Sequence, residues 1–150
     1  GIDVRIVKEI NPLVSITPVP RSDSSIRGLV NIRGQVILVM DLAVIFGREP
    51  VNITSASQII ILKTTSELKN IRSDDESIKD LGLGDKPIGF VVDRIHDVIG
   101  IGEQDFEPVP PHLEPGNARF FDGVVRFGDE LLMILNAREV LAGEGVAATR

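Results

Sequence analysis

The chain contains no cysteine, carries fewer basic than acidic residues and has no long apolar run. Without cysteine it forms neither disulfides nor thiolate metal sites, which is compatible with a reducing cytoplasm. Its net charge of −6 and its lack of Lys/Arg runs argue against binding to nucleic acid or to anionic membrane surfaces. No apolar stretch approaches the roughly 20 residues of a membrane-spanning helix, so we expect no membrane insertion.

Side chains that could carry chemistry are also sparse. His96 and His112 are the only histidines and lie far apart in the sequence, which makes a weak case for a metal site. Asp93 and Asp97 have no nucleophile nearby, and residues 82–86 lack the spacing of a phosphate-binding loop. We therefore predict no catalytic residues, no metal, no cofactor and no enzymatic activity.

What the chain does have is a β-rich composition. Hydrophobic residues make up 43%, with valine and isoleucine dominant, and 14 Gly and 9 Pro punctuate them. Short helices are expected at 41–46 and 136–141, loops at 63–86 and 107–117, and a fraying tail after Leu141. Strands are expected at 2–10, 13–19, 35–40, 58–62, 88–92, 95–101, 123–127 and 131–135.

An internal repeat organises these elements. Residues 26–41 and 121–136 both read apolar-x-Gly, two apolar residues, a turn containing Gly, five apolar residues, and then Asp or Asn before a short helix. A weaker echo pairs residues 1–10 with 89–98. One strand–turn–strand plan used twice predicts two similar β lobes, each too small to bury its own core well and therefore pressed together.

The same residues carry a family resemblance. The segment Gly28-Leu-Val-Asn-Ile-Arg-Gly34, inside residues 26–42, closely resembles the signature of CheW-like domains, and residues 1–10, 89–98 and 120–141 match three further family motifs in order. The chain departs from the family in starting at Gly1 without the usual preceding strand, so that strand is either missing or replaced. It also has Leu38 where the family has proline, Asn136 where it has aspartate, and a longer 63–86 connection.

The resemblance implies an all-β fold of two five-stranded SH3-like β-barrels packed together with a groove between them, plus short helices. It makes residues 1–150 one CheW-like domain of two intertwined lobes, the first mainly 13–62 and the second mainly 88–141. Family members are non-enzymatic cytoplasmic adaptors, recruited to membrane-bound receptor arrays. They couple the helical tip of chemoreceptors to the regulatory domain of the histidine kinase CheA.

Three other functions stay open. The chain could be the CheW-like module of a larger CheA- or CheV-type protein, or an adaptor of a receptor pathway other than chemotaxis. A β-barrel enzyme or small-ligand binder would instead require a pocket with convergent polar groups.

The resemblance also assigns binding residues. Arg33 would hydrogen-bond receptor side chains, although a solvated turn residue is the plainer interpretation. Gly28 and Asn31 would serve backbone geometry first, and His112 lies in a proline-rich loop expected near the kinase. The full receptor-binding set is Val7, Glu9, Ile10, Gly28, Asn31, Arg33, Ile95 and Val98, whose apolar members line either the groove or the core.

Overall fold

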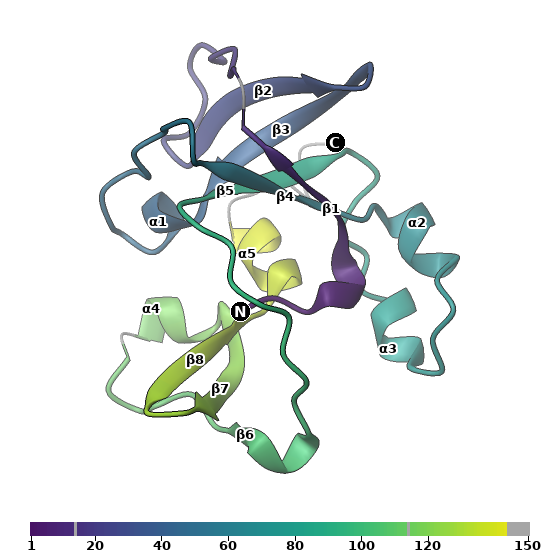
Figure 1. Cartoon of the computed structure of the whole chain (residues 1–150), viewed down its shortest axis with the longest axis vertical. Helices are drawn as coiled ribbons and strands as arrows, with labels where there is room; N and C mark the ends of the chain where they lie inside the picture. Colours follow the sequence, from purple (N-terminus) through teal and green to yellow (C-terminus); the bar gives the residue numbers. More distant parts are fainter. Residues whose placement is uncertain (14, 114, 144–150) are drawn as a thin grey trace. The chain divides into compact units, whose positions relative to one another are not determined.

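The computed structural model describes residues 1–13, 15–113 and 115–143, and most of its regular structure is strand. The described chain divides into two units. The larger unit comprises Arg5–His96, and the smaller one comprises Gly1–Val4 together with the residues from Asp97 onward (Figure 1). The predicted all-β class with two β units is confirmed.

The larger unit is built on a five-stranded sheet in the order β1-β4-β5-β3-β2. All neighbouring strands run antiparallel except β3 and β5, which are parallel. Its core gathers side chains from β2, β3, β4 and β5, because β-branched residues alternate toward one face of each strand. The elements are η1 (Val4–Ile6, which begins in the smaller unit), β1 (Val7–Pro12), β2 (Ile26–Ile32), β3 (Gln35–Asp41), α1 (Leu42–Ile45), β4 (Gln58–Leu62), α2 (Thr65–Lys69), α3 (Glu76–Lys79) and β5 (Ile88–Val92).

The smaller unit has a three-stranded sheet in the order β6-β7-β8. Gly1 lies against the free edge of β8, where its nitrogen donates to Met133 O at 2.6 Å and its carbonyl accepts from Leu135 N at 2.8 Å. The described residues thus give this unit three strands and one parallel backbone contact, where the resemblance implied five strands. Its elements are η2 (Glu103–Asp105), β6 (Phe106–Glu107), α4 (Pro115–Ala118), β7 (Phe121–Phe127), β8 (Glu130–Leu135) and α5 (Ala137–Gly143).

The sequence repeat is also a structural repeat. Each copy is a β-hairpin followed by a short helix, β2–β3–α1 in one unit and β7–β8–α5 in the other. In each copy the glycine lies at a β-bulge, Gly28 on β2 and Gly123 on β7. A Cβ on Gly28 would lie 2.3 Å from Thr17 O, and one on Gly123 would lie 2.7 Å from Glu107 O. Both glycines therefore let another backbone cross the hairpin at close range.

Several expectations about local structure are wrong. The 63–86 connection is not a loop throughout, because it holds α2 and α3 and buries Leu68, Ile78 and Leu83. The stretch 95–101 forms no strand, since the strands beside β5 offer pairing partners only as far as Val92. Residues 15–19 contribute only an isolated bridge at Thr17, and residues 2–10 begin with η1 before β1.

The predicted lobe boundary also differs from the structure. The second lobe is expected mainly at 88–141, whereas β5 (Ile88–Val92) is hydrogen-bonded between β4 and β3 in the larger unit. Conversely, Gly1–Val4 belong with the C-terminal part of the chain. The expected fraying tail lies, from residue 144 on, outside the described residues.

Candidate functional site

The β2–β3 hairpin presents Arg33 at its tip. Ile32 pairs with Gln35, which leaves Arg33 and Gly34 as a two-residue loop. Both have positive φ, 52° and 81°, the pattern of a type I′ turn, whose twist matches that of the flanking strands. Asn31 supports this turn from the preceding strand, since its Oδ1 accepts a hydrogen bond from Gly34 N at 2.9 Å. The signature residues thus build a tight turn that projects the arginine outward.

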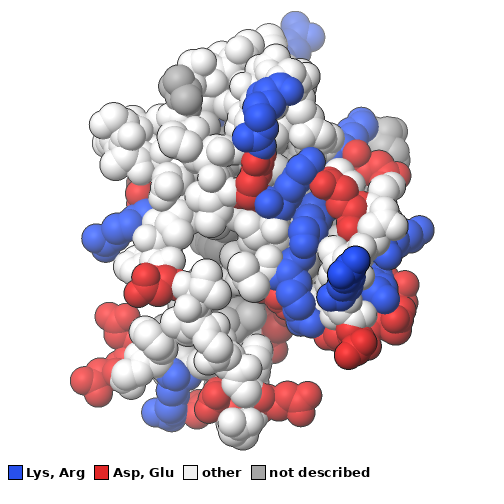
Figure 2. Space-filling view, turned by 45° about the vertical axis from the view of Figure 1, so that its right-hand side comes forward, with Lys and Arg blue, Asp and Glu red and all other residues white. Residues whose placement is uncertain are grey.

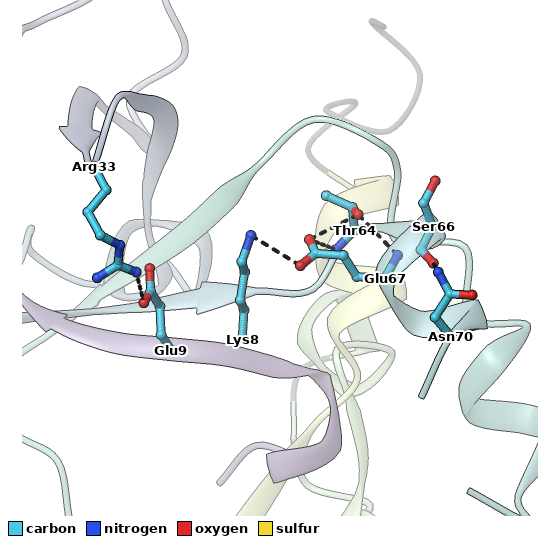
Figure 3. Close-up of polar contacts among 7 residues, drawn as sticks. All are labelled: Lys8, Glu9, Arg33, Thr64, Ser66, Glu67 and Asn70. Atoms are coloured by element: carbon cyan, nitrogen blue, oxygen red, sulfur yellow. Dashed lines mark hydrogen bonds and ion pairs between the residues drawn. The ribbon is translucent and has the colours of Figure 1, made fainter. Parts of the chain in front are cut away.

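Arg33 forms an ion pair with Glu9 of β1 (Figure 3). The arginine side chain stays 68% exposed, while that of Glu9 is 24% exposed. A charge-assisted hydrogen bond orients the guanidinium, yet most of its surface and its remaining N–H donors face outward. Glu9 therefore holds Arg33 in a position from which it can still hydrogen-bond a partner.

A bulge in β1 brings a second ion pair next to the first. Val7 pairs with Leu62 and Glu9 with Ile61, so Lys8 is the extra residue. Lys8 and Glu9 consequently extend to the same side of β1 (Figure 3). The Lys8 Nζ lies 3.1 Å from Glu67 Oε2 on α2. Two ion pairs from neighbouring residues of β1 therefore lie on one side of it, one directed to the β2–β3 turn and the other to α2.

Glu67 also starts the α2 helix. Its Oε1 accepts hydrogen bonds from Thr64 N at 3.2 Å and Thr64 Oγ1 at 3.0 Å, and Thr64 Oγ1 accepts from Glu67 N at 3.3 Å. This reciprocal pattern is a capping box. Burial alone would raise the pKa of Glu67, but the hydrogen bonds from Thr64 and Lys8 and the charge of Lys8 together hold that pKa below its usual value.

Charged side chains gather around these ion pairs. Figure 2 shows Lys and Arg side chains in a band over β1 and the α2–α3 segment, with carboxylates beside them. Arg5 pairs with Asp75 at 3.2 Å, and Lys63 Nζ donates to the carbonyl oxygen of Arg5 at 2.8 Å. The start of β1 is therefore fastened to the segment between β4 and β5 by several polar contacts.

The other residues predicted to bind the receptor differ in exposure and in position. Gly28 is buried beneath the chain's own Ile16 and Thr17, so its role is intramolecular. Ile10 is 43% exposed on β1, whereas Val7 and Ile95 are half-buried.

The last two predicted residues lie in the smaller unit. Val98 is 78% exposed, and His112 is exposed in the turn that follows the prolines. Of the whole predicted set, the ion pair brings together Glu9 and Arg33, and Asn31 shapes the turn of Arg33.

Small-ligand chemistry has little support in the larger unit. An open depression of about 360 Å³ lies beside β5. Its polar members Asp93, Arg94 and His96 are all exposed, so none forms the buried polar anchor that a ligand pocket uses. The depression is lined by Leu42, Ala43, Val51, Val91, Val92, Asp93, Arg94 and His96.

A metal site has no support either. Within residues 1–13, 15–113 and 115–143, no three His, Asp or Glu side chains come together as metal ligands.

Sequence reasoning missed Lys8, Thr64 and Glu67. Thr64-Thr65-Ser66-Glu67 has the Thr-x-x-Glu spacing of a capping box, which could have predicted α2 inside the supposed loop. No sequence signal placed Lys8 beside α2, because that contact depends on the pairing of β1 with β4.

Comparison with known proteins identifies the family of this chain. The family model described as "CheW-like domain" matches residues 1–144. The chain belongs to the CheW-like domain family. The chemotaxis protein CheW of Klebsiella aerogenes is 23% identical over 147 residues, which cover 98% of this chain and 77% of the relative. CheW of Bacillus subtilis is 28% identical over 144 residues, which cover 96% of this chain and 80% of that relative.

A solved structure agrees with the sequence relatives. The crystal structure of the scaffolding protein TtCheW from Thermoanaerobacter tengcongensis matches with a TM-score of 0.72 and 28% identity, covering 94% of this chain and 79% of that one. The chain is thus a CheW-like chemotaxis adaptor with the fold of that scaffold, from a family of non-enzymatic scaffolds. Among its described residues, no helix has the length and hydrophobicity to cross a membrane.

Proposed function

We propose that this cytoplasmic, non-enzymatic adaptor binds the helical tip of a chemoreceptor through the surface around Arg33 and binds the regulatory domain of CheA through a separate surface. The observation that carries the receptor arm is the Arg33–Glu9 ion pair, with a largely exposed guanidinium on a rigid two-residue turn. A turn of fixed geometry loses little conformational entropy on binding, which favours a defined contact.

Exposed apolar side chains support the kinase arm. Phe127 is 54% exposed and Leu131 59% exposed, and they flank the turn between β7 and β8. Large exposed apolar side chains that gather at one place on a surface are typical of protein interfaces. We assign the kinase contact to the β7–β8 hairpin end, with the His112 loop of the same unit as a further part of the surface.

The experiment is calorimetry of the whole chain against a receptor tip fragment and, separately, against a CheA regulatory domain. The informative variant is Arg33→Asn, since asparagine tolerates positive φ and favours this turn while the guanidinium is lost. We expect micromolar binding of both partners by the wild type, and loss of the receptor arm alone in Arg33→Asn and Arg33→Glu.

The matched control is Arg21→Glu. Arg21 is also exposed, lies in the same unit and has a positive φ of 59°, so it carries the same charge change on the same kind of backbone. It should leave both affinities unchanged. A wild-type chain that binds neither partner would show that the proposed function is wrong.

A further inference from the structure

The bulge in β1 gives Lys8 a place next to the Arg33–Glu9 pair. In a regular strand, neighbouring side chains would point to opposite faces of the sheet. Here Lys8 and Glu9 point to the same side, one toward α2 and the other toward the β2–β3 turn (Figure 3). The bulge thus adds an ammonium group to the side of β1 that holds Arg33.

Glu67 positions that ammonium without surrounding it. One carboxylate oxygen is used by the capping box, and the other lies 3.1 Å from Lys8 Nζ. The Lys8 side chain is still 33% exposed, and the ion pair needs one of its three N–H donors. The remaining donors are available to an acceptor that approaches from the side of Arg33.

The segment that supplies Glu67 is held in place. Leu68, Ile78 and Leu83 are buried, and the Arg5–Asp75 ion pair ties the start of α3 to the residues before β1. Because α2 and the β2–β3 hairpin belong to one unit, the position of Lys8 relative to Arg33 is fixed by the fold. The two cations therefore keep a constant arrangement within the larger unit.

We propose that the receptor-binding surface extends from Arg33 across Lys8 onto α2, and that Lys8, positioned by Glu67, binds an acidic side chain of the receptor's helical tip. This inference rests on the proposed function and adds a specificity-determining residue to it. A carboxylate is the complementary group, because the ammonium and the guanidinium both stay partly exposed and keep N–H donors beyond their ion pairs with Glu67 and Glu9. Glu67 acts through Lys8 and is a positioning residue.

The test is a double-mutant cycle on the whole chain, measured by calorimetry against the receptor tip fragment. Lys8→Gln should weaken binding about threefold to fivefold, the range of a partly exposed ion pair, and should flatten the salt dependence of the affinity. Lys8→Arg should keep the affinity. Glu67→Gln should weaken binding by a smaller factor in the wild-type background and have no effect in the Lys8→Gln background.

Glu67→Gln separates positioning from folding, because glutamine also completes a capping box and so keeps α2. Lys86→Gln, an exposed lysine in the same unit, is the matched control and should change nothing. Circular dichroism and unchanged CheA binding report that each variant is folded.

The outcomes are distinguishable. If the wild type binds the receptor fragment and Arg33→Asn abolishes that binding while Lys8→Gln does not alter it, this inference alone is wrong. Tighter binding by Glu67→Gln would show that Glu67 competes with the partner, which overturns its positioning role. No binding by the wild type overturns the proposed function and this inference together.

Discussion

Asp41 is the buried charge on which the larger unit depends, and Asp41→Asn is the sharpest test of its packing. The side chain is 0% exposed. Its Oδ1 accepts from Ala43 N at 3.0 Å, and its Oδ2 accepts from Arg27 Nη1 at 2.7 Å and from Val51 N at 2.9 Å. One carboxylate thus caps α1, pairs with an arginine and fixes the chain beyond α1.

Asparagine cannot replace it in either orientation. If the asparagine oxygen points toward Arg27 and Val51, the NH₂ group faces the N–H donor of Ala43. If the amide is turned over, the NH₂ group faces the two donors from Arg27 and Val51. A buried unsatisfied polar group costs about 1–3 kcal/mol, and breaking a buried ion pair costs about 3–5 kcal/mol. We therefore expect the free energy of unfolding to fall by about 3 kcal/mol, allowing for the partial exposure of Arg27.

The assay is urea unfolding followed by circular dichroism, because the chain has neither tryptophan nor tyrosine for fluorescence. With a slope of about 2 kcal/mol per molar urea, the midpoint should fall by roughly 1.5 M. Asp122→Asn is the control, the same substitution at an exposed carboxylate, and should cost less than about 1 kcal/mol. A change below about 0.5 kcal/mol for Asp41→Asn would refute the argument.

Three further predictions follow from the repeat and from α2. Gly28→Ala should lower the free energy of unfolding by about 2–5 kcal/mol, because the alanine Cβ would clash with a backbone oxygen at a residue of positive φ. In the same urea assay Gly34→Ala should cost clearly less, because a Cβ at that position meets no atom within 4 Å. Asn136→Asp should cost about 0.5–1 kcal/mol, since Asn136 Nδ2 donates to Asp122 Oδ1 at 2.8 Å and two carboxylates would repel there. Adding Asp122→Asn should restore the loss, and equal stability of both variants would contradict this account. The lowered pKa of Glu67 means that its carboxylate stabilises the fold above its usual pKa, and that this contribution disappears as the pH falls through the lower folded value. Thermal unfolding of wild type and Glu67→Gln should therefore differ at pH 7 and converge in acid, and a constant difference would be inconsistent with the ion pair.

The departure of Asn136 from the family pattern has a structural explanation. In one repeat Arg27 donates to Asp41, and at the corresponding positions of the other repeat Asn136 donates to Asp122. The donor and the acceptor have exchanged places across the hairpin. An aspartate at position 136 would face the like charge of Asp122. Asparagine can donate to Asp122 and still cap α5 by accepting from Glu139 N.

Much of the fold could be predicted from local pattern. The apolar runs at 35–40, 58–62 and 88–92 are strands in the structure, and the residues that open the two short helices cap them. The prediction was wrong at 95–101, where β-branched residues are present but no neighbouring strand continues beside β5. A strand needs a partner, and the partner is not visible in its own sequence. In the 63–86 connection a recognisable Thr-x-x-Glu signal was overlooked among polar residues.

By itself, the sequence determined the β-rich class, the twofold repeat and the glycine-containing turn that carries Arg33, because strand patterning and turn chemistry are properties of a few neighbouring residues. Only the tertiary structure decided what lies beside Arg33. Glu9 reaches it from β1, and Lys8 reaches Glu67 in a segment far along the chain. These contacts exist because β1 pairs with β4 at the sheet edge and a bulge turns Lys8 toward α2. Strand order and register are set by the packing of the whole sheet, and no local pattern encodes them.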